Sequence, residues 1–409
     1  MSNQTPTSRQ TPQSRQTPKV LSVAIAGCGT IGRTHAASVA EIADLRVTAL
    51  VDEIAEAAEG LAQHIEGQGA ARPATFRSLA EAFAGADVDL VIIATPSGLH
   101  IQQALEVLDA GKHVVIEKPL DVSLDRADEI LEAAKAAEAK GLVASVISQH
   151  RFDSASIVVD EARRAGRFGR LTSAIASVSW YRSQGYYDSG AWRGTWAMDG
   201  GGAVMNQGVH TVDLLLWFLG RPVEISAKTA LLAHTDVEVE DTAVATVTFE
   251  SGALAVLHAT TAAYPGLTVR LQVMGSKGSA VIDNDNLQFF HAAASDEETQ
   301  SGPMGFPGAS NQAEAELARF AEPATQTNLD PTLYPAGHIR QYRDVVDAIR
   351  NGRPAGVTIQ DAVTALSTVR ALYVSATLGH PVLIADVSAG KYNDVQVQTG
   401  NGSLEEVTA

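Results

Sequence analysis

The sequence predicts an α/β protein with two domains: a parallel sheet covered by helices, followed by an α/β domain with a large open, mainly antiparallel sheet. Three observations predict this class. A short apolar run ends in a glycine turn at 27–32. Apolar strands and helical stretches then alternate as far as residue 147, and after His150 the pattern changes to alternating strands separated by turns.

The length and the two ends of the chain set the domain limits. With 409 residues the chain is longer than one hydrophobic core normally organises, which favours two domains. We expect the first domain at 19–150 and a substrate and oligomerisation domain at 151–387. The remaining segments, 1–18 and 388–409, are polar. The first lacks the apolar core of a signal peptide, so we expect a disordered tail there, and the second reads as a polar tail that frays.

Composition disfavours several kinds of partner and site. The formal charge of −17 argues against nucleic acid and anionic membrane, because both bind basic surfaces. No apolar run reaches the roughly 18–20 residues that span a bilayer. Cys28 is the sole cysteine, so neither an intramolecular disulfide nor a thiolate metal cage can form. A reducing cytoplasm suits such a chain, and no metal is expected.

The glycine turn has the spacing G-x-G-x-x-G, with Gly27, Gly29 and Gly32 directly after a β-branched run. In a dinucleotide-binding Rossmann domain these glycines make a tight turn, let the backbone approach a pyrophosphate and let helix and strand pack closely. The phosphates would lie at the amides that begin the following helix. On its own the pattern is equally typical of an incidental glycine turn.

An acidic residue at the end of the second strand strengthens this interpretation. "RVTALVDEI" ends its apolar run at Asp52, 23 residues after Gly29. A carboxylate there can accept both ribose hydroxyls and repel a 2′-phosphate, which favours NAD over NADP. The alternative is a solvated acid at a strand end.

Further strands and helices complete the first domain. Strands are expected at 89–95, 113–117 and 142–147, with helices at 101–110 and 123–140. Ligands of parallel sheets bind at the carboxyl ends of the strands. Thr95-Pro96 and Glu117-Lys118 fall at those ends, so both pairs are expected at the cofactor cleft.

The second domain is predicted from its alternating strands. They are expected at 171–181, 223–233, 241–250, 253–261 and 267–275, with a long surface loop at 292–335 and helices near 337–351 and 359–378. One face of such a sheet packs on helices and the other is free. A free face of this size commonly pairs with another subunit, so we expect a homodimer or homotetramer.

Three polar residues lie in the apolar stretch "DGGGAVMNQGVHTVDLLLWFLG" (199–220). Offsets of four and seven residues place Asn206, His210 and Asp213 on one side of a helix. Polar groups beside so many apolar residues need partners or a cleft. They therefore form either a site, or a capping asparagine and a core histidine satisfied by Asp213.

Taken together, these motifs resemble the glucose–fructose oxidoreductase/inositol dehydrogenase (Gfo/Idh/MocA) family of NAD(P)-dependent enzymes. The resemblance is carried in order by GCGTIGRTH (27–35), ATPSGLH (94–100), EKP (117–119) and GGGxxxNQGxHxxD (200–213). It implies hydride transfer between a nicotinamide and a hydroxyl-bearing carbon of a sugar or cyclic polyol. His210 is then the general base and Lys118 contacts both the nicotinamide ribose and the substrate oxygen.

The resemblance also assigns weaker site residues. Where many members have Asp, this chain has Asn206, which can orient a hydroxyl but cannot lend negative charge to His210 or Lys118. Trp192 and Arg193 are expected beside the nicotinamide and Arg182 beside the substrate. The cofactor-binding set is Gly27, Gly29, Thr30, Ile31, Gly32, Asp52, Thr95, Pro96, His100, Glu117, Lys118, Trp192 and Arg193. The substrate-binding set is Lys118, Arg151, Arg182, Asn206 and His210.

Two of these residues have an equally simple alternative. His100 contacts the cofactor ribose or is a polar residue at a helix start. Arg151 reaches the cleft or bridges the two domains.

The leading hypothesis is an NAD-dependent dehydrogenase of a sugar, glycoside or cyclic polyol. The alternatives are a hydrolase or epimerase that retains NAD for transient oxidation, and a non-catalytic sensor of dinucleotide and sugar. A sensor would not need both Lys118 and His210.

Overall fold

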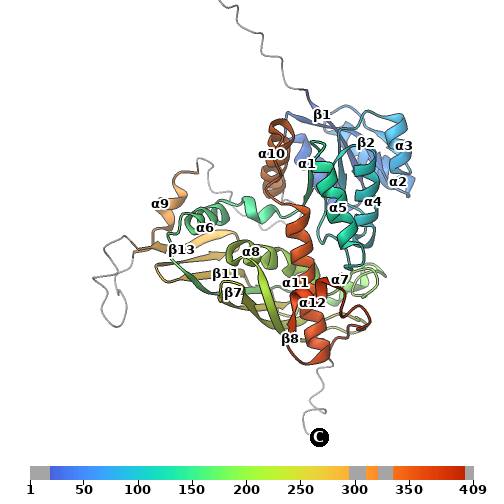
Figure 1. Cartoon of the computed structure of the whole chain (residues 1–409). Coiled ribbons are helices and arrows are strands. Elements are labelled where there is room, and N and C mark those ends of the chain that lie inside the picture. The colour runs from blue at the N-terminus through green and yellow to red at the C-terminus, as the bar shows by residue number, and fades with distance from the viewer. Residues whose placement is uncertain (1–18, 294–309, 321–334, 401–409) are drawn as a thin grey trace, which may run out of the picture.

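The structure is a computed structural model that describes residues 19–293, 310–320 and 335–400. The predicted disordered tail at 1–18 and the end of the polar tail, 401–409, lie outside the described residues. Figure 1 shows two domains, with the amino-terminal one in blue and teal and the open sheet of the second below it.

The first domain is a six-stranded parallel sheet in the order β3-β2-β1-β4-β5-β6. Its strands are β1 (Leu21–Ala26), β2 (Leu45–Val51), β3 (Ala74–Phe76), β4 (Leu90–Ile93), β5 (His113–Ile116) and β6 (Ala144–Val146). The order reverses between β1 and β4, which is where doubly wound sheets bind their ligands. The predicted Rossmann domain is confirmed. β3 was not predicted, because three residues are too short to show a period.

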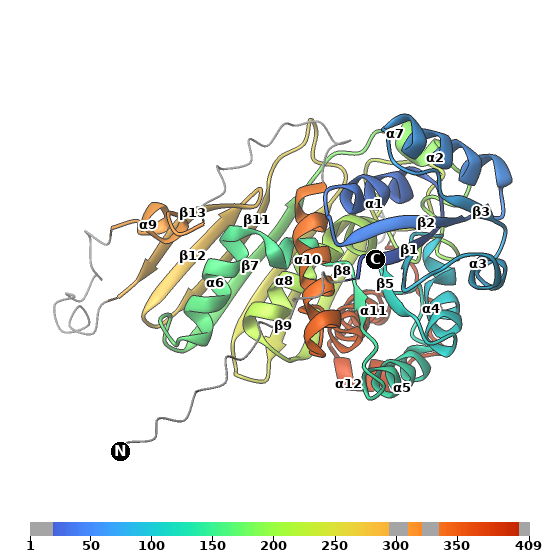
Figure 2. The same cartoon turned by 90° about the horizontal axis from the view of Figure 1, so that it is seen from above.

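Helices cover both faces of this sheet. They are α1 (Thr30–Ala40), α2 (Ala55–Gly67), α3 (Leu79–Gly85), α4 (His100–Asp109) and α5 (Ala127–Glu138). A short 3-10 helix, η1 (Ser97–Leu99), precedes α4. One face is completed by a helix from the far end of the chain, α10 (Pro335–Asn351), whose Tyr342 and Val345 are buried with Ile25 and Leu50. α10 lies beside α1, between the two domains (Figures 1 and 2).

The second domain contains an eight-stranded sheet in the order β13-β12-β11-β7-β10-β9-β8-β14. The strands are β7 (Leu171–Ser179), β8 (Pro222–Ala230), β9 (Thr242–Phe249), β10 (Leu254–Thr260), β11 (Val269–Gly275), β12 (Gly278–Asp283), β13 (Asn286–Ala292) and β14 (Val382–Leu383). Every pair is antiparallel except β7 with β10. The predicted mainly antiparallel sheet is confirmed, although β12, β13 and β14 were not predicted.

One face of this sheet is covered by α6 (Ser154–Arg164), α8 (Val209–Leu219) and α11 (Ile359–Leu378). Ala176, Leu257 and Leu271 of the sheet are buried in one cluster with residues of these helices. In Figures 1 and 2 the helices lie on a single side. On the other face Ile175, Val244 and Val256 are 41–48% exposed, and no helix of the described residues covers them.

Smaller elements complete the second domain. They are η2 (Gln149–Phe152), α7 (Gln184–Asp188), the π-helical η3 (Ala203–Gly208), α9 (Ala313–Leu317) and α12 (Ile384–Ser388). α9 is a short helix within 292–335, where a long surface loop was predicted, and residues 294–309 and 321–334 of that range lie outside the described residues. Among the described residues no helix combines the length and the hydropathy needed to cross a membrane.

The described part of the polar tail is attached to the second domain rather than frayed. Tyr392 and Val397 are partly buried against the core. Thr399 Oγ1 donates a hydrogen bond of 2.8 Å to the main-chain oxygen of Glu238. The tail therefore holds a fixed position at least as far as residue 399.

Candidate active site

The glycine turn between β1 and α1 is tightly packed at Gly27 and Gly32 and open at Gly29. Gly27 has φ +93°, and a Cβ there would lie 2.4 Å from the main-chain oxygen of Ala94. A Cβ at Gly32 would lie 2.1 Å from the main-chain oxygen of Gly27, so only glycine lets α1 pack this closely. Gly29 is exposed and a Cβ on it would meet no atom within 4 Å. Thr30 and Ile31 are exposed beside it at the start of α1.

Asp52 lies against this turn at the end of β2. Its Oδ2 accepts a hydrogen bond of 2.8 Å from the main-chain nitrogen of Cys28, and Oδ1 accepts one from Ile54. These bonds fix a carboxylate beside the glycine turn, where the sequence places the ribose contact. Burial, together with the nearby Asp52 charge, raises the pKa of the Cys28 thiol to about 12.

The loop after β4 is held by His100. Thr95 Oγ1 donates to Gln103 Oε1 at 2.7 Å, and Pro96 is exposed. The His100 ring is buried, with Nδ1 2.8 Å from the main-chain oxygen of Pro119 and Nε2 2.9 Å from that of Thr95. It therefore ties two loops together from a helix start, and the expected cofactor contact through its ring nitrogens is replaced by contacts with the main chain.

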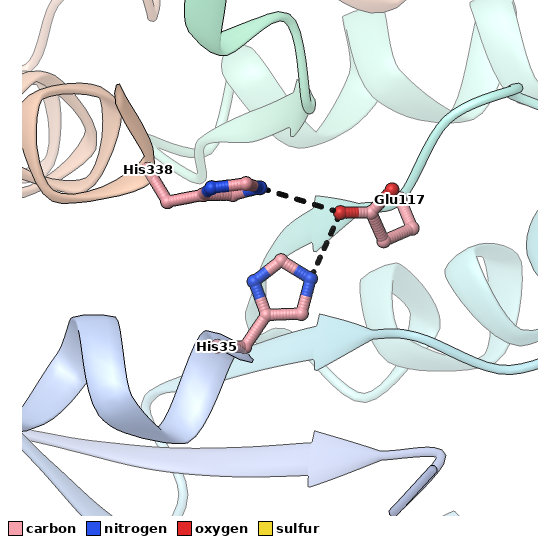
Figure 3. Close-up of side chains that lie close together, drawn as sticks. All are labelled: His35, Glu117 and His338. Carbon is pink, nitrogen blue, oxygen red and sulfur yellow. Dashed lines mark ion pairs between the residues drawn. The ribbon is translucent and has the colours of Figure 1, made fainter. Parts of the chain in front are cut away.

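The Glu117 side chain points into a buried cluster with His35 and His338 (Figure 3). Its Oε1 is 2.9 Å from His35 Nε2 and 3.7 Å from His338 Nε2, while Oε2 accepts from the Lys118 main-chain nitrogen. Burial opposes ionisation, but the neighbouring rings of His338 and His35 hold the Glu117 pKa well below its usual value. The carboxylate thus holds the main chain of Lys118 in place. This orientation does not support the expected contact of Glu117 with the cofactor.

Two groups of described residues have the donor atoms for a metal ion. They are His35, Glu117 and His338, and His150, Asp153 and Asp285. In the first, Tyr342 Oη lies 2.8 Å from His35 Nδ1. The hydroxyl accounts for Nδ1, whereas His35 Nε2 and Glu117 Oε1, although 2.9 Å apart, have no hydrogen-bond partner among the described residues.

Lys118 and His210, predicted as the catalytic pair, come together. Lys118 follows β5 and His210 lies in the first turn of α8, and both line one hollow with Ser148, Val209 and Leu366. Lys118 Nζ donates to the main-chain oxygen of Asn206 at 3.2 Å. Burial lowers the pKa of Lys118, while the charges of Glu117 and Asp199 oppose this.

A buried carboxylate holds the glycine run that precedes α8. Glu240 accepts hydrogen bonds of 2.9 Å from the main-chain nitrogens of Gly202 and Val204 and from Tyr373 Oη. A Cβ on Gly202 would lie 1.8 Å from the Glu240 main-chain oxygen, which explains the glycine. Burial raises the pKa of Glu240 to about 7. This contact was not predicted, because nothing in the spacing connects positions 202 and 240.

The sequence analysis missed a second acid, Asp199, whose charge acts on Lys118. Asp199 is buried, and its Oδ2 accepts from the Gly194 main-chain nitrogen at 2.8 Å. Burial raises its pKa, while hydrogen bonds from Gly194 and Asn206 and the charges of Arg193 and Lys118 act in the opposite direction. The carboxylate that Asn206 lacks is therefore present nearby. The sequence signal that could have identified Asp199 is its position directly before the three glycines at 200–202.

The polar partners of α8 differ from those expected. Asp213 accepts hydrogen bonds of 2.6 and 2.7 Å from Arg151 and a further one from Ser148, so it does not serve His210. Arg151 is buried between Asp213 and Asp361. It is a bridge, and the expected substrate contact of Arg151 is wrong because the guanidinium is enclosed by these carboxylates.

His210 instead contacts His150, with ring centroids 5.2 Å apart. Burial, followed by the positive charges of Lys118 and His150, lowers the pKa of His210 well below its usual value. The ring is therefore neutral near neutral pH and can accept a proton.

The remaining candidates stack in the loop around α7. The Arg193 guanidinium lies 4.3 Å from the Trp192 ring and 4.4 Å from the Tyr186 ring, and it donates to Tyr186 Oη. Arg182 lies 5.1 Å from Trp180 and 5.3 Å from Tyr186. These residues form one cation–aromatic stack, in which Trp192 is 44% exposed.

Comparison with known proteins decides the family. Residues 21–145 match the oxidoreductase family with an NAD-binding Rossmann fold, and residues 158–281 match the Gfo/Idh/MocA carboxy-terminal domain. The chain belongs to the Gfo/Idh/MocA family. It is an NAD(P)-dependent oxidoreductase, as the sequence predicted.

Relatives in this family include enzymes of cyclic polyols and sugars. The chain is 28% identical to inositol 2-dehydrogenase of Rhizobium meliloti over 68% of its own length and 79% of the relative. It is 28% identical to 1,5-anhydro-D-fructose reductase of Ensifer adhaerens over 86% of its own length and 96% of the relative. Among solved structures, the chain is similar to the WlbA dehydrogenase of Bordetella pertussis in complex with NADH and UDP-GlcNAcA. The TM-score is 0.74 and the sequence identity 29%, over 90% of this chain and 99% of that one.

Two glycine substitutions separate folding from nucleotide binding at the turn. Gly32→Ala forces a Cβ against the Gly27 main chain, so we expect a loss of about 1–3 kcal/mol in the free energy of unfolding. Gly29→Ala meets no protein atom and should leave stability unchanged, while weakening NAD binding about tenfold or more. Thermal unfolding and calorimetric titration measure the two effects. If Gly29→Ala bound NAD like the parent protein, the turn would not be the pyrophosphate site.

Proposed function

We propose that this enzyme is an NAD-dependent dehydrogenase that oxidises one hydroxyl-bearing carbon of a sugar, glycoside or cyclic polyol to a ketone. The observation that carries the proposal is the meeting of Lys118 and His210 at one hollow beyond the carboxyl end of β5. A cation and a neutral imidazole together suit an alcohol that loses a proton from oxygen as a hydride leaves carbon. The named activities of the inositol and anhydrofructose relatives support this substrate class.

The cofactor proposed is NAD. Gly27, Gly29 and Gly32 would hold the pyrophosphate and Asp52 the ribose, where its carboxylate disfavours a 2′-phosphate. The exposed start of α1 leaves room for that approach. When bound, the nicotinamide ring supplies the hydride acceptor.

His210 and Lys118 divide the work on the substrate hydroxyl. Neutral His210 accepts the hydroxyl proton as the carbonyl forms, and the Lys118 ammonium stabilises negative charge developing on the same oxygen. Asn206, whose main chain accepts from Lys118, remains a candidate for orienting a neighbouring hydroxyl. Arg182, Trp192 and Arg193 line the loop proposed to cover the sugar and the nicotinamide.

The proposal is tested by NADH formation at alkaline pH against inositols, aldoses, anhydrosugars and glycosides, with NAD and NADP supplied separately. Turnover with NAD on one cyclic hydroxyl compound is expected. Preference for NADP would show that the role given to Asp52 is wrong. Protein that retains NAD through purification and forms no net NADH from any substrate would point to transient oxidation instead. NAD binding with no chemistry at all would point to a sensor.

Substitution of the catalytic pair should remove turnover and spare NAD binding. We expect Lys118→Met and His210→Asn each to lower kcat by ~10²–10⁴, because each removes a group that acts on the substrate oxygen. Lys135→Met and His64→Asn make the same changes at exposed helix positions and should leave kcat unchanged. Retained turnover in either catalytic variant would contradict its assigned role.

We further propose that the exposed sheet face pairs two copies of the chain, as a homodimer or within a homotetramer. Ile175, Val244 and Val256 lie on neighbouring strands of that face. Val256→Asp should lower the mass measured by light scattering, whereas Ile54→Asp, at an exposed position of the first domain, should not. A monomeric parent protein would show that the face is not used.

A further inference from the structure

A second polar cluster lies beside His210 and is built from two segments of the chain. His150 is in η2, Asp153 immediately precedes α6, and Asp285 is in the turn between β12 and β13. His150 Nδ1 lies 2.9 Å from Asp153 Oδ2 and 3.0 Å from Asp285 Oδ1. The His150 ring meets the His210 ring nearly edge to face, at 81°.

We propose that His150 is a positioning residue for the catalytic base: held as an imidazolium between Asp153 and Asp285, it orients the His210 ring and keeps it neutral. The proposal rests on the function proposed above for His210, and its direct test does not need a substrate.

The geometry requires a proton on His150 Nδ1. A neutral ring with a lone pair on this nitrogen would face two carboxylates, whereas an N–H can donate to them. Burial lowers the pKa of His150, but Asp285 and Asp153 outweigh it and raise the pKa well above its usual value. Arg340 pairs with the other oxygen of Asp153. The negative charges of Asp153 and Asp285 are therefore matched by the positive charges of His150 and Arg340.

Asp285 reaches His150 because of the turn that carries it. Asn284 and Asp285 have φ of +44° and +63°, a conformation that asparagine and aspartate tolerate better than most residues. Gln149 lies at the other ring nitrogen, with an amide atom 3.4 Å from His150 Nε2, and Gln149 Oε1 is buried without a hydrogen-bond partner among the described residues. An imidazolium needs an acceptor at Nε2, which Gln149 supplies when its amide is turned so that Oε1 faces this nitrogen. The hairpin thus supplies one of the two carboxylates that hold the ring.

The cation on His150 acts on His210 together with its other neighbours. Lys118 and His338 also disfavour a proton on His210, while Glu117 favours one. Removing the His150 charge should raise the pKa of His210. Because the base must be unprotonated to act, the acidic limb of kcat/KM should move to higher pH by the same amount.

The test is a pH titration of the nucleotide-free protein by NMR with ¹³C-labelled histidine, in which His210→Asn identifies the His210 signal. His150→Gln is expected to raise the pKa of His210 by about one to two units. Asp285→Asn should raise it by less, because the positive charge of His150 and the negative charge of Asp285 are lost together. The double variant should shift it no further than His150→Gln alone. Asp283→Asn, which removes a carboxylate from the same hairpin beside Arg270, is the matched control and should leave the titration unchanged.

An unchanged His210 titration in folded His150→Gln or Asp285→Asn protein would overturn the proposal. If His150→Gln does not fold, the Asp285→Asn variant provides the test. The side chain of Asp285 is 41% exposed, so its substitution should be tolerated by the fold. A wild-type titration altered by a chelator would also overturn it, since a metal ion rather than a proton would then join the three residues. Because the titration needs no turnover, it gives its answer even if every substrate in the dehydrogenase panel fails.

Discussion

The carboxylate of Glu117 is the interaction on which the site depends. It stands at the end of β5 and joins three parts of the chain that are distant in sequence: His35 in the helix after the glycine turn, His338 in α10, and the main chain of Lys118 (Figure 3). A buried charge is stable only when its surroundings satisfy it. The position of Lys118 is therefore coupled to the helix that follows the glycine turn and to a helix from the carboxy-terminal part of the chain.

That helix, α10, links the two domains through successive side chains. Tyr342 meets His35, Gln341 bonds the main chain at Val146 and Ser148, and Arg340 pairs with Asp153. One face of α10 thus completes the Rossmann core while its first turns hold the segment that carries His150. Because α10 packs on both, Lys118 and His210 approach each other in a defined geometry even though they belong to different domains.

The sequence was most informative where a single local pattern fixes the chemistry. The placement of the three glycines, Asp52 and the strand ends was predictable because it follows from one turn and one sheet. Lys118 and His210 were found through a resemblance to a known family. The pairing of Arg151 with Asp213, and that of His150 with Asp285, were not predictable, since periodicity indicates which face a residue lies on and not which distant residue it meets.

The same limit explains the missed carboxylates. Glu240 reads as an ordinary acid near a strand, and only the packing of the glycine run against its main chain reveals its partner. Asp199 begins the quoted stretch 199–220, but the sequence does not show that it lies near Gly194 and Lys118 in the fold. Glu117 was expected at the cleft because it adjoins Lys118, but its side chain is turned into the cluster with His35 and His338.

The buried Cys28 has a practical consequence. With its pKa near 12, the thiol is scarcely ionised at neutral pH, and its side chain is enclosed beneath the glycine turn. Alkylating reagents and mild oxidants therefore find almost no thiolate on the native chain. A cysteine introduced on the loop around α7 would be the sole reactive thiol, so a fluorophore or spin label placed there would report on that loop without background from the rest of the protein.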